Sequence, residues 1–159
     1  MNALVDLLRE NARLSNEQLA AILGITADEV AKQIKQLEEE GIIIGYSAIL
    51  NEEKLDSNAV TAFIEVRVSP QVDCGYDDIA RIIAQYDEVD TVQLMSGSFE
   101  LAVTIRGTKL RDVAMFVSDR LATLDGVLST TTHFLLQRYK EKGINFAGED
   151  ADERSLVSP

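Results

Sequence analysis

The stretch SNEQLAAILGITADEVAKQIKQLEEEG, residues 15–41, contains a series of helix start and stop signals. Ser15 is a favourable N-cap, and Gln18 follows it at the spacing of a capping box, so a helix is predicted to begin here. Gly24 is expected to end that helix, because glycine readily adopts the left-handed conformation of a helix C-terminus. Thr26 caps the next helix in the same way. The stretch therefore predicts two short helices joined by a three-residue turn, the helix-turn-helix layout.

Apolar side chains at helical spacing precede and fill this stretch. A helix before it presents Leu4, Leu7 and Leu8 on one face and ends at the turn of residues 11–13. The two following helices are expected to bury Leu19, Ala20, Ile22 and Leu23, and Val30, Ile34 and Leu37, respectively. The β-branched residues 42–44 predict a strand, and a strand pair beside the last helix would make this domain winged. The alternative is a purely structural subdomain of three capped helices.

The second half of the chain alternates strand and helix patterns. Residues 60–68 follow a period of two, with Ala62, Ile64, Val66 and Val68 on one face. The later elements are expected as a helix with Tyr76, Ile79, Ala80, Ile83 and Ala84 on its apolar face, strands at 89–95 and 99–105, a helix with Leu110, Val113, Ala114, Val117 and Leu121, and a strand at 127–137. The order β-α-β-β-α-β predicts a ferredoxin-like domain, so the fold class is α+β.

Four regions follow from these patterns. Residues 1–50 are expected to form the helix-turn-helix domain, and the polar residues 51–59 a linker. Residues 60–138 would form the ferredoxin-like domain, and residues 139–159 an acidic C-terminal tail. We expect at least residues 148–159 of that tail to be mobile.

The charge of the chain is unusual for a protein with a helix-turn-helix. The 159 residues include 27 acidic and 15 basic side chains, for a formal net charge of -12. The net charges of residues 1–58, 59–138 and 139–159 are -6, -4 and -2, so none of these parts is basic overall. Taken alone, this balance argues against binding to nucleic acid.

Composition excludes several other classes of protein. With 46% hydrophobic residues and two prolines, the chain can bury a core and does not resemble a disordered acidic chain. Its apolar runs are too short for a membrane span, and its acidic opening lacks the features of a secretory signal. A single cysteine, Cys74, and a single histidine, His133, exclude an intramolecular disulfide and a Cys/His zinc site. We therefore expect a cytoplasmic protein without a metal or cofactor.

The second face of the predicted sheet carries apolar residues that no predicted helix of the chain would bury. Its candidate residues are too apolar to suit water and too few to form a second core: Phe63, Ala102, Thr104, Thr131, His133 and Leu135. A second copy of the chain is the natural cover, so we expect a homodimer built by stacking two sheets.

Motifs in both halves resemble the Lrp/AsnC transcriptional regulators. In the first half these are NARLS at residues 11–15, QLA at 18–20, GIT at 24–26 and GIIIGY at 41–46. In the second half they are the glycine loop SGSFE at 96–100, followed by Gly126-Val127 and threonines in the last strand. The resemblance covers residues 1 to about 142. It implies a DNA-binding regulator that forms homodimers and higher homo-oligomers and responds to an amino acid or a related metabolite.

The resemblance also implies positions for contacts with double-stranded DNA. The third helix would lie in the major groove, and the start of the second helix would face phosphate groups. The expected contacts to DNA are Thr26, Lys32, Gln33, Lys35 and Gln36, with Ser15 and Asn16 as phosphate contacts at the helix N-terminus. The alternative for Gln33 and Gln36 is that they are only solvated.

The third helix departs from the family pattern. Gln33 and Gln36 stand where the family commonly has arginines, and acidic residues outnumber the two lysines along this helix. We also expect the chain to begin directly in its first helix, without the short N-terminal arm found in many members. Because neutralised phosphates supply much of the affinity, we expect weak, salt-sensitive binding per monomer that depends on multivalency.

For the effector, the resemblance points to the glycine loop. Gly97 and Ser98 would let a ligand carboxylate approach backbone N–H groups, and Glu100 would hold an amino group. Thr130 and Thr132 are further polar candidates. The alternative is that Gly97 only forms a hairpin turn and Glu100 is a solvated strand residue.

Two other functions stay open. Some relatives with this plan resemble decarboxylases of haem precursors, but here Ile43-Ile44 replaces their Arg-Arg pair, and His133 lies in a strand where a structural role is typical. The chain has no Ser/His/Asp set and no glycine-rich phosphate loop, so we expect no enzymatic activity. A metabolite-sensing oligomer with weak or lost DNA binding is the third possibility, and the acidic third helix favours it.

Overall fold

The computed structural model describes residues 2–55, 58–69 and 75–146. The chain divides into two compact units, Met1–Ile49 and Leu50–Pro159, and each is described by itself. We call them the helical unit and the sheet unit. The expected mobile segment, residues 148–159, lies outside the described residues.

The helical unit contains three helices, α1 (Ala3–Glu10), α2 (Asn16–Leu23) and α3 (Ala27–Glu39). Both predicted capping boxes are present, at the starts of α2 and α3. The core consists of Leu4, Leu19, Ala20, Val30 and Leu37, and Ile34 and Leu23 pack against it. These contacts confirm the helix-turn-helix and most of its predicted apolar faces.

Two expectations for this unit are wrong. Ile22 is 58% exposed, because it lies about 100° around the helix from Leu23 and so points away from the α2 core face. Residues 42–50 form no strand in the described chain, so the strand expected at residues 42–44 is not observed. Instead, the N–H groups of Ile42 and Ile43 donate to the Leu37 carbonyl at 2.9 and 3.0 Å and close α3. The β-branched run has no neighbouring strand here with which to form a ladder.

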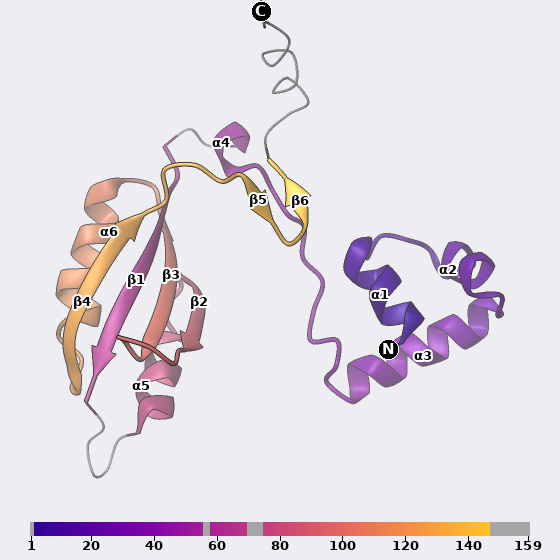
Figure 1. Cartoon of the computed structure of the whole chain (residues 1–159), viewed down its shortest axis with the longest axis horizontal. Helices are drawn as coiled ribbons and strands as arrows, with labels where there is room; N and C mark the ends of the chain where they lie inside the picture. The colour runs from indigo at the N-terminus through magenta and orange to yellow at the C-terminus, as the bar shows by residue number, and fades with distance from the viewer. Residues whose placement is uncertain (1, 56–57, 70–74, 147–159) are drawn as a thin grey trace, which may run out of the picture. The chain divides into compact units, whose positions relative to one another are not determined.

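The sheet unit has the predicted order of elements (Figure 1). The elements are β1 (Val60–Val68), α5 (Tyr76–Ile83), β2 (Val89–Leu94), β3 (Leu101–Gly107), α6 (Leu110–Phe116) with its π-helical continuation η1 (Val117–Leu121), and β4 (Val127–Phe134). The strands form one antiparallel sheet in the order β2-β3-β1-β4. Figure 1 shows α5 and α6 behind this sheet. The ferredoxin-like α+β fold is confirmed.

The core of this unit lies between the sheet and the two helices. Ala62, Ile64, Val66 and Val68 of β1 are all buried, as their alternation predicts. They pack with the inward residues of β3 and with α5 and α6, in the cluster that includes Ile79, Ile83, Leu101, Val103, Ile105, Val113, Phe116 and Leu121. The opposite face of β1 forms the uncovered face of the sheet, which we call the outer face.

The π turn changes which side of the α6–η1 helix is buried. Ala114 and Leu110 are exposed, although the helical spacing places both in the apolar stripe, and Phe116 is buried instead. The N–H of Ala122 donates to the carbonyl of Val117 at 2.8 Å, which closes a wider turn than an α-helix does. This wider turn returns Leu121 to the core.

Three further elements differ from the expectations. A short helix, α4 (Glu52–Leu55), lies within the expected linker. Strand β4 ends at Phe134 instead of residue 137, because its ladder with β1 stops at the Ala62–Phe134 pair, although the Leu135 N–H still donates to the Thr61 carbonyl at 2.9 Å. In the expected tail, β5 (Lys140–Glu141) and β6 (Ile144–Asn145) form a small hairpin. Its turn residues Lys142 and Gly143 both have positive φ, as in the two-residue turns that suit hairpins.

Two glycines with positive φ allow a graded stability prediction. Gly24 has φ of +69° and open space where a Cβ would lie, whereas a Cβ on Gly126 (φ +89°) would lie 2.8 Å from Cδ1 of Ile79. We expect Gly24→Ala to lower the free energy of unfolding of the helical unit by about 1–2 kcal/mol, through backbone strain alone. Gly126→Ala should cost the sheet unit more, because a clash adds to the strain. Thermal and chemical unfolding of both variants would measure this; equal losses would contradict it.

Candidate nucleic-acid and ligand-binding sites

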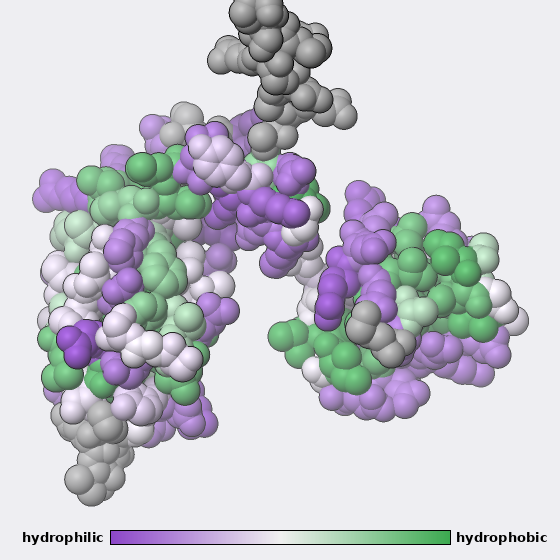
Figure 2. Space-filling view, viewed as in Figure 1, coloured by the Kyte–Doolittle hydropathy of each residue, from purple (hydrophilic) through white to green (hydrophobic). Residues whose placement is uncertain are grey.

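The first candidate site is the solvent face of α3. All four of its predicted DNA contacts are exposed or half-buried at the surface: Lys32, Gln33, Lys35 and Gln36. Lys32 lies on the opposite side of the helix from Val30 and Ile34, which pack in the core. Figure 2 shows hydrophilic side chains along the edge of the helical unit that α3 forms. The fold therefore leaves these four side chains exposed to solvent.

Acidic residues at both ends of α3 limit the positive charge of this face. Asp28 and Glu29 lie in the first turn, and Glu39 and Glu40 at the end. Lys35 Nζ lies 3.5 Å from Glu39 Oε1, and Gln36 Nε2 donates to Glu40 Oε1 at 2.7 Å. Exposed pairs of this kind stabilise a protein by at most about 1 kcal/mol, so a phosphate group can replace the glutamates as the partner of Lys35 and Gln36.

The helix starts hold their predicted side chains in capping contacts. Ser15 Oγ accepts from the Gln18 N–H at 3.2 Å, and the Ser15 N–H donates to Gln18 Oε1 at 2.9 Å. Thr26 Oγ1 donates to Glu29 Oε2 at 2.8 Å. Asn16 is the first residue of α2, where backbone N–H groups have no partner inside the helix. Ser15 and Thr26 thus position the helices through their side chains, and the N–H groups of the first turn remain the groups that suit a phosphate.

The cap of α3 makes the helical unit sensitive to acid. The backbone N–H of Thr26, and then its hydroxyl, donate to Glu29 and hold the pKa of that carboxyl below its usual value of 4.5. A lowered pKa means that the cap stabilises the fold above pH 4.5 and that this contribution disappears as the pH falls through the lower pKa of the folded state. We expect the melting temperature of the unit to fall there, and Glu29→Gln to reduce this part of the pH dependence. Melting curves across this range, with Asp6→Asn as the control, would test it.

The second candidate site is the glycine loop between β2 and β3. Gly97 and Ser98 are exposed, and Glu100 is half-buried. Glu100 Oε2 accepts a hydrogen bond from the N–H of Val68 at 2.7 Å, which ties the loop to the end of β1. Glu100 therefore has a structural contact that its position in the sequence does not reveal.

The two threonines lie on β4, away from the loop by two strands. Thr130 pairs with Val66, which pairs in turn with Leu101, and Thr132 pairs with Ile64. Since directly opposed residues share a face, both threonines lie on the helix-covered face, and both are half-buried. The loop and Thr130 lie at the same end of the sheet. Thr132 lies two residues further along β4, away from that end.

The outer face of the sheet carries aromatic and charged side chains. Phe63 is 37% exposed and contacts Phe99 and His133, with ring centroids 6.1 Å apart in each pair. His133 Nε2 lies 3.1 Å from Glu65 Oε1. Ala102, expected on this face, is buried by its neighbours. The alternation along β1 already places Glu65 on this face, whereas sequence reasoning missed Phe99 as part of the surface.

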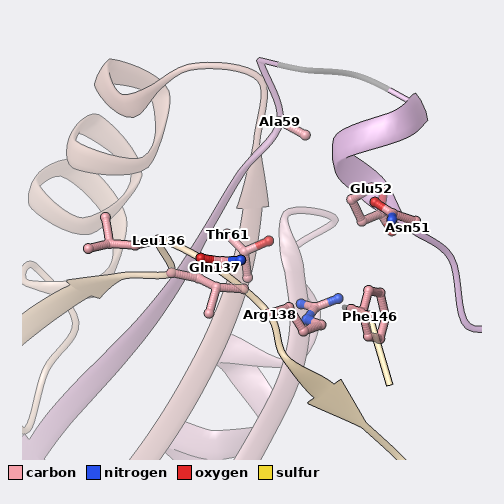
Figure 3. Close-up of a pocket in the computed structure, with 9 residues that line it drawn as sticks. Asn51, Glu52, Ala59, Thr61, Leu136, Gln137, Arg138 and Phe146 are labelled. Carbon is pink, nitrogen blue, oxygen red and sulfur yellow. The ribbon is translucent and has the colours of Figure 1, made fainter. Parts of the chain in front are cut away.

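A third site, a pocket of about 330 Å³, was not foreseen (Figure 3). Its walls come from α4, the start of β1, the chain after β4 and the end of the β5–β6 hairpin. They include the polar side chains of Asn51, Glu52, Gln137 and Arg138 and the ring of Phe146. The signal that could have found it is the Lys-Gly turn between Tyr139 and Phe146, which predicts a hairpin in the supposed tail.

The described residues contain no group of three or more His, Cys, Asp or Glu side chains that could hold a metal ion. Among the same residues, no helix is long and apolar enough to cross a membrane.

Comparison with known families connects the two units to known domains. Residues 61–144 match the family model described as the Lrp/AsnC ligand binding domain, and residues 3–44 match a winged helix-turn-helix DNA-binding domain. The chain belongs to the Lrp/AsnC family. This confirms the resemblance from the sequence, and the protein is a transcriptional regulator of the Lrp/AsnC type.

Relatives and solved structures agree with this membership. An uncharacterised helix-turn-helix regulator of Bacillus subtilis, YugG, is 46% identical to this Lrp/AsnC chain, over 98% of the chain and 95% of the relative. The regulator LrpA of Pyrococcus abyssi is 31% identical, over 86% and 94%. A transcriptional regulator of Neisseria meningitidis, solved in complex with L-methionine, is 27% identical with a TM-score of 0.73, over 87% and 88%. Both of these curated relatives are named as transcriptional regulators and not as enzymes.

Proposed function

We propose that this Lrp/AsnC regulator binds operator DNA through α3 as a homodimer and that an amino acid controls the binding. The observation that carries the proposal is the exposed row of Lys32, Gln33, Lys35 and Gln36 on α3, a helix that begins, as α2 does, with a capping box. Lysine suits phosphates or guanine, and glutamine can pair with an adenine edge. Asn16 and the first N–H groups of α2 supply phosphate contacts. Such a regulator acts in the cytoplasm, where its operator lies.

Footprinting on genomic DNA tests the DNA part of the proposal directly. At low salt, the full chain should protect a site in the region upstream of its own gene. The affinity should fall steeply as salt is raised, because the contacts are mainly to phosphates. No protection at any salt concentration would instead favour a metabolite-sensing oligomer without DNA binding, the candidate that the acidic ends of α3 support.

Removing the acidic residues at the end of α3 is expected to strengthen the binding of DNA. Glu39 and Glu40 engage Lys35 and Gln36, so replacing both with glutamine should release the two contacts and remove repulsion from phosphates. We expect the double variant to bind the operator several-fold more tightly than the wild type at low salt and with a smaller advantage at high salt. Fluorescence anisotropy titrations would measure this; the matched control is Asp87→Asn together with Asp125→Asn in the sheet unit. A weaker or unchanged affinity would argue against α3 as the DNA-binding helix.

We propose the outer sheet face as the dimer interface. Phe63 and Leu135 are exposed there, beside the Phe99 and His133 rings, and a second copy of the same face would bury them. Phe63→Asp should convert the dimer into a monomer in analytical ultracentrifugation at micromolar concentration, whereas Leu110→Asp on the helix layer should leave the dimer intact. A monomeric wild type would overturn this part of the proposal.

For the effector, we propose the glycine loop as the primary site. Gly97 and Ser98 are exposed, and their backbone N–H groups would bind a carboxylate; Glu100 accepts from the Val68 N–H with one oxygen and would bind an amino group with the other. Thr130 and Thr132 lie on β4, two strands from the loop in the same chain, so we leave them out of this site. The L-methionine complex of the Neisseria relative supports an amino acid as the ligand class. A thermal-shift screen with the twenty amino acids tests this, and no stabilisation by any of them would point to a ligand-independent member.

A further inference from the structure

We propose that the pocket beside the β5–β6 hairpin is a second ligand site, which takes a small zwitterion: an α-amino acid with an apolar side chain. At about 330 Å³ the pocket is at the lower end of the usual range for small-molecule sites. Segments far apart in the sequence converge on it: residues 51–52, 59–61, 135–138 and 146. The inference rests on the proposed function only in taking amino acids as the effectors.

Arg138 supplies the cationic wall. Its side chain is only 24% exposed, and Nη1 lies 2.8 Å from Oε2 of Glu141. Its guanidinium lies over the ring of Phe146, at 5.6 Å from the ring centroid, and this cation–π contact restricts the orientation of the guanidinium. A guanidinium carries five N–H donors in a fixed fork, so the pair with Glu141 leaves donors for a carboxylate. Arg138 is thus oriented for binding before a ligand arrives.

Glu52 and Asn51 supply a wall of the opposite character, across from Thr61 and Gln137 in Figure 3. Glu52 is 27% exposed, and its Oε1 accepts from Arg106 Nη1 at 2.9 Å. An ionised carboxylate can accept about four hydrogen bonds, so this contact leaves capacity for an ammonium group. The amide oxygen of Asn51 is a further acceptor beside it.

The two walls together select the charge type of the ligand. A simple anion would meet the carboxylate of Glu52, and a simple cation would meet the guanidinium of Arg138. A molecule that carries both a carboxylate and an ammonium group can satisfy both walls. The apolar side chains of Leu135, Leu136 and Phe146 line the same pocket, so the ligand side chain is expected to be apolar.

This site is separate from the glycine loop. The pocket includes Ala59 and Thr61 at the start of β1, whereas Glu100 of the loop binds Val68 at its end. At about 3.3 Å per residue, the strand separates the two by roughly 20–25 Å. Every residue that lines the pocket belongs to the sheet unit.

Isothermal titration of the full chain with L-leucine, L-methionine and L-phenylalanine tests the proposal. We expect at least one of them to bind, while isocaproate and isoamylamine, which each lack one charge of leucine, bind at least about tenfold more weakly. Arg138→Gln and the pocket-filling Ala59→Leu should each raise the Kd of this site at least about tenfold. The matched control is Glu141→Gln, which breaks the same ion pair but keeps Arg138, and should change the Kd by less than about twofold.

The outcomes separate this site from the loop. Gly97→Val should leave the pocket affinity unchanged. If Gly97→Val abolishes all binding while Arg138→Gln and Ala59→Leu bind like the wild type, the pocket is not a site, and the proposed loop site stands. If Glu141→Gln loses binding as fully as Arg138→Gln and Ala59→Leu does not, Arg138 only supports the hairpin and the proposal fails. If no amino acid binds the wild type, both effector sites fail, and footprinting still decides DNA binding.

Discussion

Replacing Lys32 and Lys35 together with glutamine is expected to lower the affinity for operator DNA at least about tenfold at low salt. These lysines are the two basic residues of α3, and a dimer would lose four positive charges from its DNA-binding surface. The loss should shrink as salt is raised, because the wild type then loses the same phosphate contacts to counterions. The slope of log K against log salt should become shallower by about 0.9 for each lysine that contacts a phosphate.

The matched control for this variant is Lys140→Gln together with Lys142→Gln. It makes the same change in net charge on the exposed β5–β6 hairpin of the sheet unit. We expect it to change the affinity by less than about twofold. Anisotropy titrations over a range of salt concentrations compare the three proteins. Equal losses in both double variants would mean that only overall charge matters, and an unchanged Lys32/Lys35 variant would rule out α3 as the DNA-binding surface.

Ile64→Ala is expected to have the largest effect on stability. Ile64 is fully buried in the central part of β1, between its ladder partners Val103 and Thr132. Truncation removes buried methyl groups and leaves a cavity in a packed core, which costs about 2–5 kcal/mol. This is a large share of the stability of a small domain, so much of the sheet unit should unfold at physiological temperature.

The readout of this variant uses the division of the chain. Because the helical unit has its own core, its unfolding transition should be retained while that of the sheet unit shifts. Leu128→Ala is the control, since Leu128 lies in the same sheet but is 65% exposed, and it should cost less than about 1 kcal/mol. Urea unfolding followed by circular dichroism would measure all three proteins. A loss no greater than that of Leu128→Ala would contradict the placement of Ile64 in the core.

Signals that span a few residues were predicted correctly from the sequence. The capping boxes of Ser15 and Thr26 and the left-handed Gly24 are present as expected. Each of them depends on contacts between residues at most four positions apart, so the local sequence contains all the necessary information. The period-two pattern of β1 belongs to the same class, because alternation alone assigns side chains to the two faces of a strand.

Predictions failed where the outcome depends on a distant partner. Residues 42–44 have the composition of a strand but no neighbouring strand to pair with, so they form no strand. The stripe of α6 was wrong at Ala114, because a π turn changes the helical phase, and periodicity assumes a constant phase. Strand β4 is shorter than predicted, because its ladder with β1 stops at the Ala62–Phe134 pair.

The two domains, their order and the four surface side chains of α3 can be predicted from the residues alone, because capping and hydrophobic periodicity are local properties of the chain. The contact of Glu100 with Val68, 32 positions away, and the pocket around Arg138 become visible only in the folded chain. The pocket joins segments up to 95 positions apart, from Asn51 to Phe146. No local sequence pattern predicts that these distant segments line one pocket, since the pocket arises from the packing of the whole sheet unit.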